Sequence, residues 1–183
     1  MNATRIARRT LGGALMSATL LALPLVGFGT VEAKQVNHGA QAPTWLTYNA
    51  KTHTANLTII AGYSSDAAGF NFNGSSKGKM VVSVPSGTKV VVTFSNNGAL
   101  PHSVAFSSYA SRTMASGFKP AFAGSESPNA SVGIAKGPKQ TVKFVAGKAG
   151  TYAIVCAVPG HVSAGMWDTF KVTTGGKASI STK

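Results

Sequence analysis

The sequence predicts an all-β protein, a Greek-key β-sandwich of about seven or eight strands. Several short segments alternate apolar and polar residues at period two, which is the pattern of half-buried strands. Turns rich in glycine, proline and serine separate these segments. Helical periodicity is almost absent from residue 34 onward. Short strands joined by such turns are typical of a sandwich.

The strand pattern is clearest in segment 88–94, where Val90, Val92 and Phe94 share one face. Segment 140–145 repeats the pattern, with Lys143 expected to face outward. The other expected strands are 57–61, 79–84, 102–106, 151–156 and 169–173. Residues 34–183 number 150, which is enough for one core and too few for two, so we expect these strands to form one domain, over residues 56–174.

Three segments lack a clear strand pattern. Segment 107–139 is rich in glycine, serine, alanine and proline, so we expect a long loop with one short helical turn. The N-terminal extension 34–55 either adds an edge strand or covers one end of the sandwich. Residues 175–183 are expected to be a flexible tail.

The first 33 residues are interpreted as a signal peptide or an uncleaved membrane anchor. Arg5, Arg8 and Arg9 precede an uncharged stretch from residue 10 to 31, which ends near Ala33 in a small-residue cleavage pattern. This stretch is about long enough to cross a bilayer. Either alternative places the domain outside the inner membrane, so we expect a periplasmic location, with membrane association only if the segment is uncleaved.

The chain is strongly basic, with a formal charge of +13 and only four acidic residues. Removing residues 1–33 would remove three arginines and one glutamate, which lowers the charge to +11. The lysines are scattered and are not interleaved with aromatic residues, so no nucleic-acid partner is expected. Acid unfolding largely follows protonation of native carboxylates, and few are present. We therefore expect an acidic compartment.

One loop brings together three residue types that bind copper. Cys156, the only cysteine, begins a C-x4-H-x4-M run that continues through His161 to Met166. Thiolate and thioether suit Cu(I), and imidazole suits both oxidation states. His102 is the candidate for a second imidazole. Each residue taken alone is more often a packing residue, but their combination at this spacing indicates a copper site.

The strand pattern supports this site. Cys156 would share a strand face with Ile154, and His102 would share one with Val104. Both side chains would then point inward. Because they lie about fifty residues apart, only the folded sandwich could bring them together.

The sequence resembles the cupredoxins, the type 1 copper proteins, and within them the sulfocyanin and rusticyanin group of acidophiles. The resemblance covers residues 57–174. It rests on segment 70–74 (Phe-Asn-Phe-Asn-Gly), on Pro101-His102-Ser103 and on segment 156–167. Many relatives carry asparagine after the first histidine, whereas this chain has Ser103, as the rusticyanin-like branch does.

The resemblance implies one copper ion held by His102, Cys156, His161 and Met166. It also implies that His161 is the electron port of the site. An apolar patch of loop residues would surround it, namely Ala157, Val158, Pro159, Val162 and Ala164. Hydrogen bonds from Ser103 and from backbone amides near Asn97 are expected to hold the imidazoles and modulate the sulfur.

Such a site indicates a blue copper electron carrier and not an enzyme. A multicopper oxidase needs many more histidines, and only His38 and His53 are left over. The resemblance implies a c-type cytochrome, with a terminal oxidase as a further candidate, as partners in a respiratory chain. The alternative is a periplasmic copper chaperone or storage protein, although these favour exposed methionine or histidine clusters. A structural zinc domain fits poorly, because thioether is a poor zinc ligand.

Overall fold

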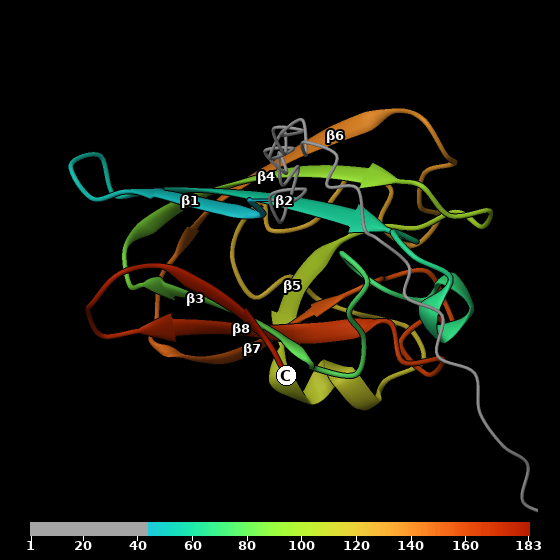
Figure 1. Ribbon diagram of the computed structural model, residues 1–183. Helices are drawn as coiled ribbons and strands as arrows, with labels where there is room; N and C mark the ends of the chain where they lie inside the picture. Colours follow the sequence, from blue (N-terminus) through green and yellow to red (C-terminus); the bar gives the residue numbers. More distant parts are fainter. Residues whose placement is uncertain (1–43) are drawn as a thin grey trace, which may run out of the picture. The chain divides into compact units, whose positions relative to one another are not determined.

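The computed structural model describes residues 44–183, which form two β-sheets packed face to face (Figure 1). The predicted signal or anchor at 1–33 and the first part of the 34–55 extension lie outside the described residues. None of the helices in residues 44–183 has the length and apolar character needed to cross a bilayer. The predicted all-β sandwich is confirmed, with nine strands in the described part.

The first sheet contains four strands in the order β1-β2-β4-β6. These are β1 (Leu46–Asn49), β2 (Thr54–Ala61), β4 (Thr88–Asn96) and β6 (Lys139–Ala146). β4 pairs in parallel with β2 and antiparallel with β6. In β4 the predicted alternation holds, because Val90, Val92 and Phe94 are buried while Lys89 and Thr93 are exposed.

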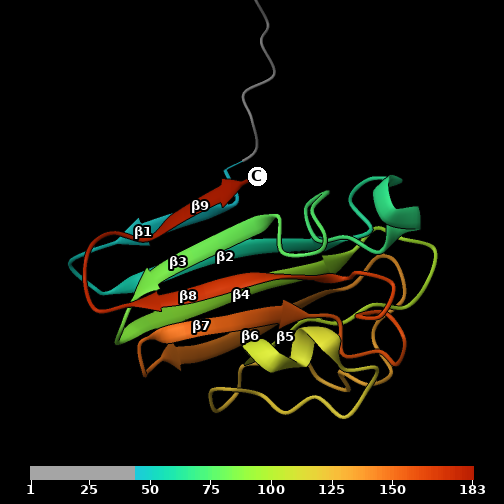
Figure 2. The same ribbon diagram turned by 90° about the horizontal axis from the view of Figure 1, so that it is seen from below.

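The second sheet contains five strands in the order β5-β7-β8-β3-β9. These are β3 (Met80–Pro85), β5 (Ala105–Ser108), β7 (Gly150–Val155), β8 (Trp167–Thr173) and β9 (Ser179–Thr182). β8 pairs in parallel with β3 and antiparallel with β7. Figure 2 looks onto this sheet, with the first sheet behind it.

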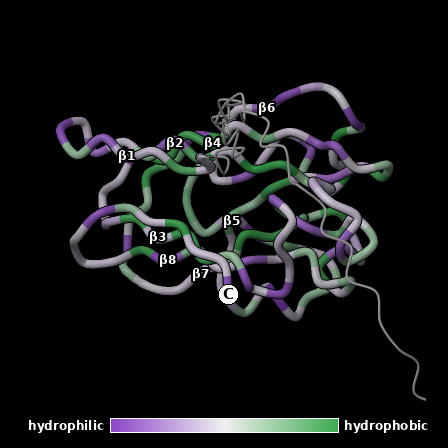
Figure 3. The backbone as a smooth tube through the Cα atoms, in the orientation of Figure 1, coloured by the Kyte–Doolittle hydropathy of each residue, from purple (hydrophilic) through white to green (hydrophobic). Residues whose placement is uncertain are grey.

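Aromatic side chains fill the space between the sheets. The Phe106 ring lies 4.7 Å from that of Phe144 and 4.9 Å from that of Phe170, between centroids. Each buried side chain of this size contributes about 1.5–3 kcal/mol of transfer free energy. Hydrophobic residues are concentrated along the strands, whereas several projecting loops are hydrophilic (Figure 3). This core fixes the strand ends that carry the site.

Two expectations about the chain ends have different outcomes. The 34–55 extension adds an edge strand, β1, which pairs antiparallel with β2. The prediction of a flexible tail at 175–183 is wrong, because β9 pairs antiparallel with β3. Ile180 packs against the core from this strand, and its neighbours Ser179 and Ser181 are exposed. The sheets therefore extend beyond residues 56–174 at both ends.

The expected strand at 102–106 is also shifted. β5 begins only at Ala105, and His102 forms an isolated bridge with Ile134. The backbone N–H groups of Ser103 and Val104 donate to side chains, the Cys156 sulfur and the Ser127 hydroxyl, instead of to a neighbouring strand. The strand pattern ends where the site begins.

The long loop at 107–139 contains the one short helical turn that was expected, the 3₁₀ helix η2 (Tyr109–Thr113). A second short turn, η1 (Asp66–Gly69), precedes segment 70–74 and was not predicted. Both turns are too short to show helical periodicity in the sequence.

Candidate metal centre

Three metal-binding side chains meet at one end of the sandwich. The Nδ1 atoms of His102 and His161 lie 3.1 Å apart. The sulfur of Cys156 lies 3.3 Å from Nδ1 of His161 and 3.8 Å from Nδ1 of His102. All three residues are buried, and within residues 44–183 they form the only group of three or more histidine, cysteine, aspartate and glutamate side chains close enough to share an ion.

The spacing of these three atoms fits one bound metal ion. A circle through them has a radius of about 2 Å, close to the metal–nitrogen bond lengths of protein sites. Two imidazoles and one thiolate are the strong donors of a blue copper centre. The geometry and the donor chemistry therefore agree on copper.

Met166 completes the predicted set. It is fully buried and belongs to the same core cluster as Cys156. Its carbonyl accepts a hydrogen bond from the N–H of Cys156 at 3.2 Å, and its own N–H donates to the carbonyl of His161 at 3.0 Å. These bonds close the loop, so the cysteine and the methionine are held side by side at its base.

Local turns shape the ligand loop between Cys156 and Met166. Gly160 and Gly165 have φ angles of 84° and 99°, values that favour glycine. The N–H of Ala164 donates to the carbonyl of Gly160, and that of Gly165 donates to the carbonyl of Val162. The C-x4-H-x4-M spacing is therefore one compact turn, and sequence alone was sufficient to find it.

Ser103 connects the two ligand-bearing segments, as predicted. Its backbone N–H donates to the Cys156 sulfur at 3.3 Å, and its hydroxyl lies 3.7 Å from the same sulfur. The hydroxyl also accepts a hydrogen bond from the N–H of Ala157 at 2.9 Å. Hydrogen bonds to the sulfur withdraw electron density from the thiolate, so Ser103 would modulate a bound metal through this ligand.

Asn96 is the supporting residue that sequence reasoning missed. Its side-chain N–H groups donate to the carbonyls of Leu100 at 2.7 Å and Ile134 at 2.8 Å, and its oxygen accepts from the N–H of Gly98 at 2.8 Å. The prediction named amides near Asn97, which is exposed and one residue away. The signal that was available is Asn96 itself, a polar residue on the apolar face of β4.

Gly98 leaves room for the first imidazole. A Cβ atom at this position would lie 3.0 Å from Nε2 of His102 and 3.3 Å from Oδ1 of Asn96. Such contacts are tighter than ordinary van der Waals packing. Gly98 thus allows the backbone to approach the ring, a reason for glycine that no local pattern reveals.

Burial perturbs the protonation of all three donors. Burial, with a contribution from neighbouring His161, lowers the pKa of His102 to about 4. Burial also lowers the pKa of His161. It raises the pKa of the Cys156 thiol, which the amides of Ser103 and Val158 partly oppose. The His102 imidazole is therefore neutral and able to bind metal down to about pH 4, and burial favours the neutral form of His161 as well. The thiol would lose its proton on binding metal.

The surface around His161 differs in part from the expected patch. His161 is 9% exposed, and of the five apolar loop residues Pro159 and Ala164 are exposed, Val158 is half-buried, and Ala157 and Val162 are buried. Ala157 and Val162 are buried because they pack in a small cluster with Ala153 and Val155 of β7.

Other loops supply apolar surface instead. Leu100, 49% exposed, lies two residues before His102. Val132 is 68% exposed and directly precedes Gly133. The backbone of Gly133 lies against His102 and Val158, because a Cβ atom at this glycine would lie 2.9 Å from both.

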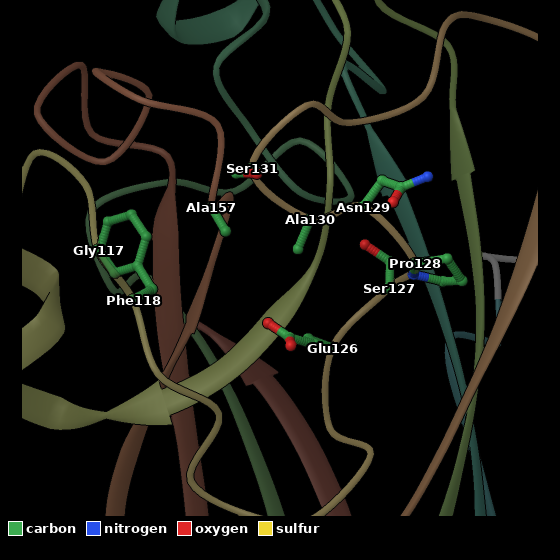
Figure 4. Close-up of a pocket in the computed structure, with 9 residues that line it drawn as sticks. All are labelled: Gly117, Phe118, Glu126, Ser127, Pro128, Asn129, Ala130, Ser131 and Ala157. Atoms are coloured by element: carbon green, nitrogen blue, oxygen red, sulfur yellow. The ribbon is translucent and has the colours of Figure 1, made fainter.

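A separate hollow of about 520 Å³ is lined in part by Ala157 (Figure 4). Glu126 is its only ionisable lining residue, and Phe118 forms one wall. The lining contains no imidazole, thiol or thioether, so this hollow is not the metal site.

Comparisons with known proteins agree with the site. A family model described as "Sulfocyanin (SoxE) domain" matches residues 41–178. Sulfocyanin of Sulfolobus acidocaldarius is 34% identical over 127 residues, which are 66% of this chain and 64% of that protein, so the match spans less than two thirds of this relative.

Two copper proteins are among the similar solved structures. Auracyanin A, a "blue" copper protein from Chloroflexus aurantiacus, aligns with a TM-score of 0.44 and 22% identity, over 66% of this chain and 99% of that one. Rusticyanin aligns with a TM-score of 0.43 and 20% identity, over 70% and 88% of the two chains. Because the family model matches residues 41–178, which include all four predicted ligands, the chain belongs to the sulfocyanin family.

Proposed function

We propose that this protein is a periplasmic one-electron carrier that passes electrons between respiratory redox partners. The observation that carries the proposal is the meeting of two Nδ1 atoms and one sulfur within 4.8 Å in a buried cluster. When bound, copper supplies one electron at a time with little change in its ligands. The protein contributes a donor geometry that hydrogen bonds from Ser103 and Asn96 hold in place.

The same features favour a carrier over an enzyme. The donors are buried, and the Phe70 ring packs edge-to-face against both imidazoles, an arrangement that favours a site closed to substrates. His53, the one other histidine in the described residues, lies in the turn between β1 and β2 and not in the cluster. A multicopper oxidase would need further ligands for additional ions.

The proposed location and partners rest on the sequence pattern and on the family. Residues 1–33 have the pattern of an export signal or anchor, which favours the periplasm. The apolar surface around His161 offers a contact through which a c-type cytochrome or a terminal oxidase could exchange electrons. The scarcity of carboxylates favours an acidic compartment. A copper chaperone or storage protein is the less favoured function, because buried donors exchange metal poorly.

The test is to load the purified chain with one equivalent of Cu(II) at neutral pH and record absorption and paramagnetic-resonance spectra. We expect an intense visible band that bleaches on reduction, returns on oxidation and persists to about pH 3. The Cys156→Ala variant should lack the band, because the thiolate is its source. A colourless, readily chelated Cu(I) form would indicate a chaperone, and loss of copper and fold at about pH 3 would contradict the acidic compartment.

A further inference from the structure

Segment 70–74 contributes no metal ligand, yet its polar side chains are unusually well bonded. Asn71 is fully buried. Its oxygen accepts from the N–H groups of Tyr63 at 3.1 Å and Gly74 at 3.1 Å, and its N–H groups donate to the carbonyls of Ser64 at 2.9 Å and Asp66 at 2.8 Å. The Asn71 side chain therefore connects residues 63–66 to Gly74 within one loop.

Asn73 attaches the same segment to the first sheet. Its oxygen accepts from the N–H of Ile60 at 2.6 Å, and its N–H donates to the carbonyl of Thr58 at 2.8 Å. Phe72 is fully buried between these two asparagines. The alternation of asparagine and phenylalanine thus gives two polar anchors with a core residue between them, and none of these contacts requires metal.

The remaining residue, Phe70, faces the metal site. Its ring lies 4.9 Å from the ring of His161 and 6.2 Å from that of His102, between centroids. The interplanar angles are 82° and 89°, so both contacts are edge-to-face. This is a favourable arrangement for aromatic rings.

The His161 ring depends on such packing for its orientation. Within residues 44–183 its Nδ1 atom faces the other two donors, and no hydrogen bond holds its Nε2 atom. Free rotation of this ring would move Nδ1 away from the shared ion. Contact with Phe70 restricts that rotation and covers the rings from water.

We propose that residues 70–74 act as a brace whose asparagine anchors hold Phe70 against the two imidazoles, making Phe70 a positioning residue for His161 and hence for the copper centre. The proposal deepens the electron-carrier function and rests on it for its physiological meaning. The brace itself exists in the metal-free protein and can be tested there.

The experiment compares Phe70→Leu with Phe122→Leu, a matched change in a partly buried ring that packs against Phe144 and not against a ligand. Each variant is examined by NMR of the histidine rings without metal, and by absorption, potential and copper release when loaded. For Phe70→Leu we expect broadened His161 ring signals, a shifted visible band and about three- to tenfold weaker copper retention. Phe122→Leu should lower the melting temperature while leaving all of these unchanged.

Rescue separates positioning from general packing. Phe70→Tyr retains the edge-to-face ring and should restore the parent spectrum and retention. The proposal is overturned if Phe70→Leu matches the parent in ring signals and copper retention, or if Phe122→Leu changes them equally. If the parent itself shows no visible band, the carrier function fails, but the metal-free ring signals still decide on the brace.

Discussion

The metal site joins two regions that are built in different ways. The ligand loop from Cys156 to Met166 carries three ligands within one compact turn and is closed by its own backbone hydrogen bonds. The segment from Asn96 to Ser103 carries a single ligand, His102. Its bonds reach to Ile134 and to Cys156, far away along the chain.

This difference separates two tasks. The ligand loop selects the metal, because the spacing of its donor types is local. The 96–103 segment sets the geometry, because distant residues must already be folded before His102 can reach the cluster. Replacing His161 in the first region should therefore change metal chemistry with little cost in folding. Replacing a buried supporting residue in the second region should cost folding free energy even without metal.

The largest expected effect comes from breaking the second region at Asn96. Asn96→Ala removes the donor to the Leu100 carbonyl and the acceptor of the Gly98 N–H, and it leaves the Ile134 carbonyl with only the N–H of His102. We therefore expect the metal-free protein to lose about 3 kcal/mol of unfolding free energy. His161→Ala, in the first region, should abolish the visible band while changing the unfolding free energy by about 1 kcal/mol or less. Chemical denaturation followed by far-ultraviolet circular dichroism measures both changes in unfolding free energy.

Asn97→Ala is the matched control, because Asn97 is exposed and adjacent. It should change stability by no more than about 0.5 kcal/mol. Equal losses for His161→Ala and Asn96→Ala would mean that the two regions do not divide the tasks as described.

The same division explains what could be predicted from sequence. Period-two patterns located the central strands, since burial on one face leaves a direct mark on the residue order. β9 was missed because its Ser-Ile-Ser-Thr sequence has only one large apolar residue. An edge strand needs little burial when one neighbour, here β3, supplies its hydrogen bonds.

For the site, the donor residues were readable and most of their supports were not. Cys156, His161 and Met166 follow one another at a spacing that packing alone does not explain. The roles of Asn96 and Phe70 depend on contacts with Ile134 and His161, far away in sequence, and that of Gly98 depends on how closely its backbone approaches the His102 ring. A single sequence does not record such contacts.

The next prediction concerns Asp168, which ties the end of the ligand loop to a distant segment. It is fully buried, and its Oδ1 accepts from the Ser75 hydroxyl at 3.1 Å and from the N–H of Met80 at 2.9 Å. Its other oxygen has no partner within the described residues. Burial raises the pKa of this carboxyl to about 7. The protonated form is thus favoured by folding.

The sign of the pH effect follows. Because the folded pKa lies above the unfolded value of 3.8, the stabilisation from Asp168 is complete below about pH 4 and is lost as the pH rises through about 7. The full pKa shift corresponds to a change of about 4 kcal/mol in the unfolding free energy. We expect about half of this change, because charged groups in proteins are better solvated than a dry interior implies.

Asp168→Asn should remove this dependence. The unfolding free energies of the metal-free parent and the metal-free variant are measured between about pH 4 and 7, and the second is subtracted from the first. This difference cancels the opposite contribution of His102, whose pKa is lowered to about 4 and which both proteins contain. The difference should change by about 2 kcal/mol across this range. A difference that does not vary with pH would show that Asp168 is ionised in the folded protein.

The smallest expected effect tests the contact between the two regions. Ser103→Ala removes the hydroxyl that lies 3.7 Å from the Cys156 sulfur but keeps the backbone N–H at 3.3 Å, so the sulfur loses only its weaker partner. A thiolate with fewer hydrogen bonds donates more strongly and stabilises Cu(II), so the reduction potential should fall. A lost interaction of about 1 kcal/mol corresponds to a fall in potential of less than about 60 mV for one electron.

Protein-film voltammetry of the loaded variant measures this shift. The control is Ser108→Ala, because Ser108 is an exposed serine on β5. A rise in potential, or an equal fall in the control, would mean that Ser103 connects the regions without tuning the sulfur.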